Sequence, residues 1–455
     1  MGEAGTSSYD IVIVGSGVGG YVSAIRAGTW GARVALVEEA DIGGTCLNRG
    51  CIPTKTLIES AAAFRTAKGI SDAAERDLAA MIARKDEVVT GLRKGVSMLL
   101  KKRKVEVVEG RGRLIDARTV EVAGPDGTAR KLSAANVILA TGSRPSSIPG
   151  LEPDGTRVFN SDTILDATDV GPRIVVVGGG ILGCEFAWIF GALGYEVTVV
   201  EMLDSIVPVF STEAAREITK AMKKLGVTIR TGTRIEGADV GDTVKLDLGG
   251  ETLEAETVLV AVGRRPNIED VGLDALGVLN DKGIVEADAT GRTSAPGLRA
   301  VGDVTGKVML AHAASHQGLA AVADCLGRPV APECSVPWCA YTHPEVALVG
   351  MLENDAAEAG KQTVTGKFPV MALGRARAAG ESAGYFKVVA DAATKRVLGA
   401  EIVGPHATDL IHEAALAVKL EATLEDLEEM VHAHPTFAEG MMEAAGVALG
   451  QAIHI

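Results

Sequence analysis

Two cysteines with four residues between them, Cys46 and Cys51, are the side chains of this sequence best suited to redox chemistry. They lie in the segment GGTCLNRGCIPTK, residues 43–55. In a regular helix, residues five apart have Cα atoms roughly 8–9 Å apart, whereas a disulfide rarely spans more than about 7 Å. A bond between them therefore requires a distorted backbone, which Gly50 makes easier. Because a strained, accessible disulfide is easily reduced, such a bond would suit a redox-active pair.

Two other interpretations of this pair are open. A CxxxxC pair can supply ligands to a zinc or iron–sulfur site, and Cys334 and Cys339 form a second pair that could complete a four-cysteine cage. Alternatively, both cysteines are reduced and structural, which is the default in the cytosol. The nucleotide-binding motifs around the first pair favour redox chemistry, so we expect no metal. The second pair, Cys184 and Cys325 are expected to be small, mostly buried side chains.

A candidate base lies near the carboxyl end of the chain, in HAHPTFAEG, residues 432–440. Thiol–disulfide exchange needs a base because the thiolate attacks and the thiol does not. An imidazole titrates near neutral pH, and a carboxylate can hold the ring in one orientation. His434 with Glu439 fits that arrangement, and Pro435 makes the link between them rigid. Taken alone, the segment fits a structural histidine near a helix start slightly better.

A glycine motif that occurs twice predicts the elements that position these groups. In each copy, residues 9–20 and 173–183, an apolar strand runs into GxGxxG and an apolar helix start. This is the context of a dinucleotide-binding turn, in which the glycines allow close approach of a pyrophosphate to the amino terminus of a helix. The glycines are Gly15, Gly17 and Gly20 in the first copy and Gly178, Gly180 and Gly183 in the second.

An acidic residue ends the next strand of each copy. Glu38 and Glu201 each follow the first glycine of their copy by 23 residues. A carboxylate at this place can bind both hydroxyls of an adenosine ribose, and it repels a 2′-phosphate. The second site is therefore expected to prefer NAD to NADP.

Similar exit motifs follow both copies: ATGSRP at residues 140–145 and AVGRRP at residues 261–266. The first exit motif begins 125 residues after the first glycine of its copy and the second begins 83 residues after. The first copy thus carries about 42 extra residues, which include Cys46 and Cys51. Glycines, acids and exit motifs together predict two nucleotide-binding domains, and two bound dinucleotides suggest a flavin, FAD, and a nicotinamide, NAD.

The rest of the chain has a different pattern. A strand ending in Gly-Asp occupies residues 298–304, and residues 333–455 show alternating apolar runs followed by helical periodicity at 408–420. Strands gathered together and followed by helices predict an α+β unit. The linker before it is marked by Pro329, Pro332 and Pro337.

Composition narrows the classes of partner. A chain of 455 residues predicts two to four domains. The net charge of -14 argues against nucleic acid or an anionic membrane as the main partner. No apolar stretch approaches the roughly 20 residues that span a bilayer, and the first residues lack the basic and apolar regions of a signal peptide. These features favour a cytoplasmic location.

Taken together, the motifs resemble the pyridine-nucleotide disulfide oxidoreductase family over nearly the whole chain. GGTCLNRGCIPTK is similar to the redox-disulfide signature of that family, VGGGILGCEFA to its NAD motif, AVGD to its second FAD motif and HAHPTFAEGMMEA to its catalytic motif. The resemblance implies an α/β fold with two Rossmann-like dinucleotide-binding domains and a carboxyl-terminal α+β dimerisation domain. The implied division is 1–150 and 271–332 for the FAD-binding and central part, 151–270 for the NAD-binding domain and 333–455 for the interface domain.

The resemblance also implies roles for the candidate residues. In a homodimer, His434 and Glu439 of one subunit serve the disulfide of the other. Cys46 exchanges with the dithiol substrate, and Cys51 lies against the flavin.

Cofactor-binding residues are implied in the same way. Lys55 and Glu185 match positions that pair beside the flavin N5, and Asp303 matches one that binds the FAD ribityl chain. The full expected set is Gly15, Gly17, Gly20, Glu38, Gly44, Thr45, Lys55, Thr141, Gly142, Gly178, Gly180, Gly183, Glu185, Glu201, Gly263, Gly302 and Asp303.

Within that family the chain is most similar to members that oxidise dihydrolipoamide with NAD. The implied partner is a lipoyl-bearing protein of a 2-oxoacid dehydrogenase or glycine cleavage complex.

The alternative function is that of another disulfide or metal-ion reductase of the family. Glu201 weighs against a glutathione-type reductase, which usually has basic residues there and tends to carry a gating tyrosine where this chain has Ile181. The ending QAIHI lacks the cysteine pair of mercuric reductases. A non-catalytic relative would have lost Cys46, Cys51 or His434. Arg49 and Thr54 depart from the commoner small residues of the signature.

Overall fold

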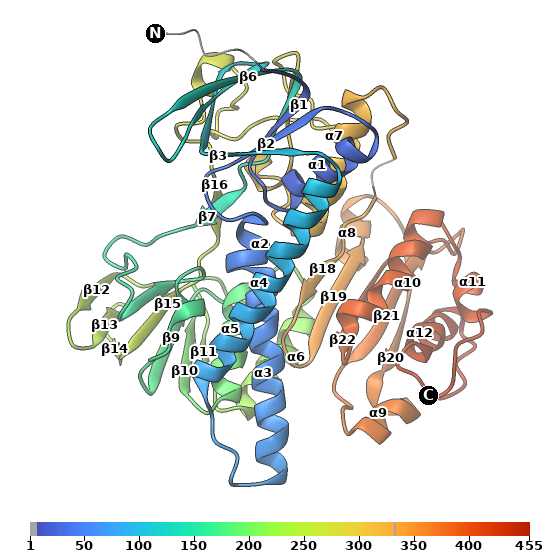
Figure 1. Cartoon of the computed structure of the whole chain (residues 1–455). Helices are drawn as coiled ribbons and strands as arrows, with labels where there is room; N and C mark the ends of the chain where they lie inside the picture. The colour runs from blue at the N-terminus through green and yellow to red at the C-terminus, as the bar shows by residue number, and fades with distance from the viewer. Residues whose placement is uncertain (1–6, 332–333) are drawn as a thin grey trace.

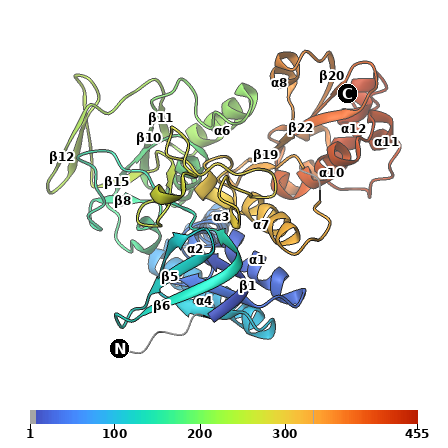
Figure 2. The same ribbon diagram turned by 90° about the horizontal axis from the view of Figure 1, so that it is seen from above.

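The computed structural model describes residues 7–331 and 334–455 and arranges them in three units, each built on a β-sheet (Figure 1). Pro332, one of the prolines expected in the linker, lies outside the described residues. Seen from above, the units form three lobes that meet at the centre of the molecule (Figure 2). The predicted α/β architecture with a separate α+β unit is confirmed.

The first unit is a seven-stranded sheet in which β1 lies between two parallel neighbours, β2 and β6. Ile11, Val12 and Ile13 of β1 are all buried, as expected for a strand with both faces covered. β17 joins this sheet beside β6 although it lies far along the chain. The strands are β1 (Ser7–Val14), β2 (Val34–Glu38), β3 (Glu106–Glu109), β4 (Arg111–Asp116), β5 (Thr119–Ala123), β6 (Ala129–Leu139) and β17 (Leu298–Ala300).

Five helices accompany this sheet. Figure 1 shows the two longest, α3 and α4, running down the middle of the molecule, where α3 packs against α5 of the second unit. No helix in the described part of the chain is both long enough and apolar enough to cross a bilayer. The helices are α1 (Val18–Thr29), α2 (Gly44–Arg49), α3 (Cys51–Ile70), α4 (Leu78–Lys102) and α7 (Ala311–Cys325).

The second unit repeats the central strand–helix–strand pattern of the first. Its five strands are parallel in the order β11-β10-β9-β15-β8, and a small antiparallel sheet of β12, β13 and β14 accompanies them. The bounds are β8 (Val158–Asn160), β9 (Arg173–Val177), α5 (Ile181–Ala192), β10 (Glu196–Val200), α6 (Thr212–Lys224), β11 (Thr228–Arg230), β12 (Gly237–Val240), β13 (Val244–Asp247), β14 (Thr252–Ala255) and β15 (Thr257–Val260).

The two exit motifs meet each other. Within them, β7 (Ser143–Pro145) and β16 (Arg264–Pro266) pair antiparallel, with Arg144 opposite Arg265. The first and second units are therefore joined by backbone hydrogen bonds at equivalent places in their sequences.

The carboxyl-terminal unit is a five-stranded antiparallel sheet in the order β18-β19-β22-β21-β20, covered by helices. The helical periodicity at 408–420 forms α10, as predicted. The elements are β18 (Trp338–Ala340), β19 (Glu345–Gly350), α8 (Glu353–Glu358), β20 (Thr363–Pro369), α9 (Gly374–Ala379), β21 (Tyr385–Asp391), β22 (Val397–Gly404), α10 (Ala407–Leu420), α11 (Leu424–Glu428) and α12 (Glu439–Leu449).

The three glycines of each turn differ in how strictly the structure requires a glycine. The first, Gly15 or Gly178, has φ of +97° or +105°, and a Cβ there would lie 2.4 or 2.5 Å from the carbonyl oxygen that begins the exit motif. The third has no room because a Cβ would lie within 2 Å of the carbonyl oxygen of the first glycine. At the second, Gly17 or Gly180, a Cβ would meet nothing within 4 Å. The fold requires the first and third glycines, whereas the second has open space beside it.

Because of this difference, two alanine substitutions in the second turn should affect stability differently. Gly178→Ala should destabilise the protein by about 2–4 kcal/mol, because it adds both backbone strain and a clash with a carbonyl oxygen. Gly180→Ala is the matched control, since Gly180 has φ of −67° and open space, and its melting temperature should stay close to that of the wild type. Equal losses in the two variants, measured by thermal unfolding, would contradict this account.

Candidate active site

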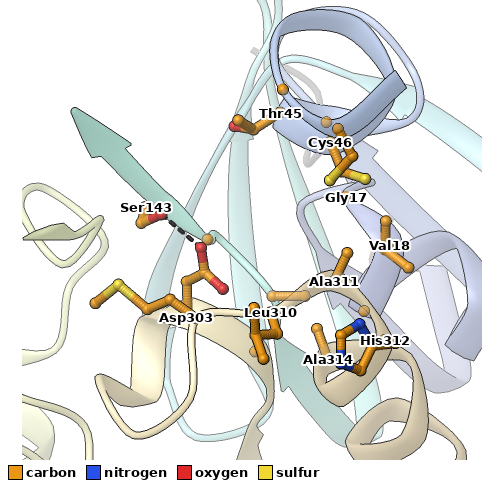
Figure 3. A pocket seen from close by; sticks show the side chains of 18 of the residues that line it. Gly17, Val18, Thr45, Cys46, Ser143, Asp303, Leu310, Ala311, His312 and Ala314 are labelled. Carbon is orange, nitrogen blue, oxygen red and sulfur yellow. Dashed lines mark hydrogen bonds between the residues drawn. The ribbon is translucent and has the colours of Figure 1, made fainter. Parts of the chain in front are cut away.

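A cavity of about 1440 Å³ lies where the first unit meets the start of α5 and β18. In Figure 3, Thr45 and Cys46 of α2 lie on one side of it, and Asp303 and the first residues of α7 lie on the other. Most of the predicted flavin-binding and redox residues line this cavity. They are Gly15, Gly17, Glu38, Gly44, Thr45, Cys46, Cys51, Lys55, Thr141, Gly142, Glu185, Gly302 and Asp303.

The two acids have the same surroundings in both units. One oxygen of Glu38 accepts a hydrogen bond from the backbone N–H of Ser16 at 2.8 Å, and one oxygen of Glu201 accepts one from Gly179 at 2.6 Å. The other oxygen in each case accepts the N–H two residues further along the chain, at 2.9 and 2.7 Å. Each carboxylate is thus fixed beside its glycine turn, at the carboxyl end of a parallel strand, where ribose hydroxyls of a dinucleotide bind.

The helical backbone is interrupted between the two cysteines, and this is the distortion that their spacing predicted. Helix α2 ends at Arg49, α3 begins at Cys51, and Gly50 between them has φ −146° and ψ −112°. A Cβ on Gly50 would lie 3.3 Å from the Cα of Cys46, so the chain folds back closely on itself here. Both cysteines carry free thiols.

The two thiols of the pair have different pKa values. The pKa of Cys51 is lowered to about 7, first because Cys46 donates a hydrogen bond to it and then because of the positive charge of Lys55, although burial opposes both. The pKa of Cys46 is raised by the same hydrogen bond and by burial. Cys51 therefore carries the thiolate near neutral pH, and Cys46 keeps the proton.

An ion pair between Lys55 and Glu185 joins all three units beside this pair. The Nζ of Lys55, on α3, lies 2.9 Å from both carboxylate oxygens of Glu185, on α5. The backbone N–H of Tyr341, just after β18, donates to the same carboxylate at 3.0 Å, and the ammonium group lies 4.3 Å from the centre of the Tyr341 ring. Glu185 is 1% exposed. A buried carboxylate is thus compensated by a cation and by a backbone donor.

Asp303 lies across the cavity from Thr45 and Cys46 (Figure 3). It belongs to the short helix η3 (Gly302–Thr305), and its carboxylate accepts a hydrogen bond from the Ser143 hydroxyl at 2.5 Å. Ser143 is held in turn by Arg264, which donates to the hydroxyl and to the backbone carbonyl oxygen, both at 2.8 Å. The position of Asp303 therefore depends on both paired exit motifs.

Two parts of the wall were not predicted from the sequence. The amino terminus of α7, which has no side-chain cap, lines the cavity with Leu310 and Ala311 (Figure 3). The hydroxyl of Thr54 is buried on the wall and has no hydrogen-bond partner among the described residues. An uncapped helix end, an unpaired donor and the open space at Gly17 fit a bound dinucleotide. The α7 segment carries no glycine motif, and only the AVGD motif just before it could have marked it.

The residues predicted for the nicotinamide nucleotide lie apart from this cavity. The second glycine turn, Glu201 and Gly263 do not line it. Helix α5 connects the two places, because it begins at the second turn while Ile181 and Glu185 line the cavity. A nucleotide on the second turn would therefore lie next to Ile181, with the flavin cavity on the other side of this residue.

His434 and Glu439 form the expected pair, with 2.9 Å between the imidazole Nδ1 and a carboxylate oxygen. The other oxygen accepts the N–H of Thr436 at 2.7 Å. Burial raises the pKa of Glu439, but the hydrogen bonds from Thr436 and His434 outweigh it and leave the pKa lowered. The His434 side chain is 77% exposed and does not line the cavity of its own chain. His432, in contrast, is 4% exposed and is bound to Glu413 at 3.1 Å.

The remaining cysteines are mostly buried, as expected. Cys184 is fully buried, and Cys325, Cys334 and Cys339 are partly exposed. Cys334 and Cys339 line the same cavity as the redox pair, because the chain passes along it before and through β18. Burial raises the pKa of Cys339 to about 11. Within the described ranges, no group of three or more histidine, cysteine or acidic side chains is placed to hold a metal ion.

Comparison with known proteins identifies the family of the chain. Residues 9–318 match the sequence profile described as pyridine nucleotide-disulphide oxidoreductase, and residues 336–445 match its dimerisation domain. The chain is 40% identical to the dihydrolipoyl dehydrogenase of Chlamydia pneumoniae over 99% of both chains. It is also 40% identical to that of Bacillus subtilis, over 98% of this chain and 99% of the relative.

Two solved structures are similar to it in fold. LpdA from Mycobacterium tuberculosis is 29% identical, with a TM-score of 0.91, over 97% of this chain and 99% of that chain. The HOCl-induced flavoprotein disulfide reductase RclA from Escherichia coli is 27% identical, with a TM-score of 0.87, over 96% of this chain and 100% of that chain.

The unequal pKa values of the two thiols can be tested by titrating the reduced protein. The ultraviolet absorbance of a thiolate should appear with a pKa of about 7 and should disappear in Cys51→Ser. In Lys55→Met the same step should move to higher pH, because the cation that stabilises the thiolate is gone. Cys184→Ser is the control and should keep the step. If the step survives in Cys51→Ser and is lost in Cys46→Ser, the assignment of the two thiols is reversed.

Proposed function

The chain belongs to the pyridine nucleotide-disulphide oxidoreductase family, and on this premise we propose that it is a dihydrolipoyl dehydrogenase. It oxidises protein-bound dihydrolipoyl groups to the lipoyl disulfide and reduces NAD, with FAD as its cofactor. The observation that carries the proposal is the Cys46/Cys51 pair on the wall of the cavity that the first glycine turn opens onto. Relatives with that name, 40% identical over nearly their whole length, support it.

The first half of the reaction is a thiol–disulfide exchange. With Cys46 and Cys51 bonded, a substrate thiolate attacks the sulfur of Cys46, and Cys51 leaves as a thiolate. The second substrate thiol then displaces Cys46, which becomes a thiol, so the substrate is oxidised and the pair is reduced. Lys55 stabilises the thiolate of Cys51, whose pKa of about 7 suits it as the leaving group.

The second half depends on where the cofactors bind. FAD supplies the two-electron chemistry between the thiolate and NAD. We assign its pyrophosphate to the first glycine turn, its adenosine ribose to Glu38 and its ribityl chain to Asp303. A flavin ring bound in this cavity would lie beside the Lys55–Glu185 pair, and the second turn with Glu201 would hold NAD. The remaining wall residues of the assignment are Gly44, Thr45, Thr141, Gly142 and Gly302, and Gly263 is assigned to the NAD site.

We assign the base to the neighbouring subunit of a homodimer. His434 is bound to Glu439, but its side chain is exposed and does not line the cavity of its own chain. The match of residues 336–445 to a dimerisation domain supports a second copy that brings the His434 of the partner subunit to Cys46. That histidine takes the proton from the substrate dithiol. The substrate itself is carried by a separate lipoyl-bearing protein of a 2-oxoacid dehydrogenase or glycine cleavage complex.

The domain division follows the same scheme. The FAD-binding and central part comprises 1–150 and 271–332, the NAD-binding domain 151–270 and the interface domain 333–455. The return of β17 to the first sheet supports the assignment of 271–332 to the first part.

Substitution of the histidine pair tests the base. His434→Gln should slow dihydrolipoamide oxidation by roughly two orders of magnitude or more, the range expected for loss of a general base. Glu439→Gln should cost less, because the imidazole remains. NADH oxidation by an artificial one-electron acceptor takes electrons from the flavin, so both variants should retain it.

His432→Gln is the matched control for this experiment. His432 is bound to Glu413 and to the Met430 carbonyl oxygen, so its loss should leave the rate of dithiol oxidation nearly unchanged. The assignment fails if His432→Gln is the crippling substitution. It also fails if His434→Gln abolishes the artificial-acceptor reaction while FAD stays bound.

Glu201 tests the nicotinamide specificity. The wild type should prefer NAD to NADP, and Glu201→Ala should reduce the ratio of the two efficiencies by about tenfold or more, the loss expected for charged hydrogen bonds to the ribose. Glu196→Ala, at the exposed start of the same strand, should keep the wild-type ratio. Equal efficiency of the wild type with both nucleotides would show that the carboxylate does not face the ribose.

A further inference from the structure

The cations on the wall of the cavity fall into two groups. Six lysine and arginine side chains line it: Arg49, Lys55, Arg111, Arg144, Arg264 and Lys419. Four of them form ion pairs with carboxylates, namely Lys55 with Glu185, Arg111 with Asp270, Arg144 with Glu269 and Arg264 with Asp162. Within the described part of the chain, Arg49 and Lys419 have no carboxylate partner.

Arg49 is the one of these two that lies on the redox helix. It follows Cys46 by three residues in α2, and side chains with that spacing are neighbours on one face of a helix. Its side chain is exposed, and both residues lie on the cavity wall. The guanidinium group is therefore within reach of a molecule whose sulfur approaches Cys46.

The short helix that carries Arg49 is held in place. The amide of Asn48 donates to the carbonyl oxygens of Ile42 and Gly44 at 3.1 and 3.0 Å, and it accepts from Arg93 of α4 at 3.0 Å. The neighbouring residue, Arg49, thus has a fixed backbone but a side chain free to meet a ligand.

The charge of Arg49 is not needed by the thiols. The cation that acts on the pKa values of both cysteines is Lys55, although the pKa of Cys46 is raised on balance. The net charge of the chain is -14, so an anionic substrate is repelled by the molecule as a whole. A single unpaired guanidinium beside Cys46 would offset that repulsion where the dithiol must arrive.

We propose that Arg49 is a specificity-determining residue that favours dithiol substrates that also carry a carboxylate. The inference rests on the proposed oxidation of dihydrolipoyl groups. The carboxylate can belong to the lipoyl acid itself or to acidic side chains next to a lipoyl-lysine. In both cases the chemistry is the same, an ion pair with a guanidinium group at the entrance to the redox pair.

The experiment compares pairs of substrates that differ in charge, using the FAD-loaded enzyme. One pair is dihydrolipoate and dihydrolipoamide. The other is a peptide with a reduced lipoyl-lysine flanked by two glutamates and the same peptide with two glutamines. For the wild type, kcat/KM should be higher for the anionic member of at least one pair. Arg49→Met should lower that preference by about threefold to tenfold, the range for one charge pair in a solvated site, and raised salt should lower it in the wild type.

Two further variants make the result decisive. Arg49→Lys should restore most of the preference, and Arg84→Met, which removes an exposed cation of α4 outside the cavity, should leave it unchanged. A preference only within the first pair assigns the carboxylate to the lipoyl acid, and one only within the peptides assigns it to the carrier. Equal preferences in the wild type and Arg49→Met would overturn the inference. If the wild type oxidises none of the four dithiols, the proposed function itself fails.

Discussion

The ion pair between Lys55 and Glu185 is the constraint on which the arrangement of the three units depends. A carboxylate that is 1% exposed is costly unless it is compensated, and here the compensation comes from an ammonium group of the first unit and a backbone N–H of the third, at Tyr341. Loss of one partner of such a pair typically costs about 3–5 kcal/mol. Any shift of one unit against the others would expose Glu185 or leave it unpaired, so the charge fixes how α3, α5 and β18 meet.

The same ion pair lies between the part of the cavity that holds the thiols and the helix that leads to the second glycine turn. On one side, the hydrogen bond from Cys46 and then the positive charge of Lys55 lower the pKa of Cys51, which becomes the thiolate of the pair. On the other, α5 leads from Glu185 back to the second glycine turn. A single charged contact between two helices thus links the sulfur chemistry of the first unit to the nucleotide turn of the second, with the space for a flavin between them.

Features that depend on local sequence could be predicted, and features that depend on long-range packing could not. The two glycine turns, the acids after the next strands and the break at Gly50 follow from residue types at short spacing, and the structure contains them all. The pairing of β7 with β16, the return of β17 to the first sheet and the place of α7 on the wall join segments more than 100 residues apart. In the site, the resemblance to a family supplied the pairing of Lys55 with Glu185, which spacing alone does not give.

The separation of His434 from the cavity of its own chain has a genetic consequence. If each active site takes its cysteines from one chain and its base from the other, a chain that lacks a redox cysteine still carries an intact base, and a chain that lacks the base still carries intact cysteines. Two inactive alleles of these kinds, expressed in one cell, would form mixed dimers with one complete site out of two. Such a pair of alleles would therefore complement each other in part. Two alleles that damage the same residue could never complement.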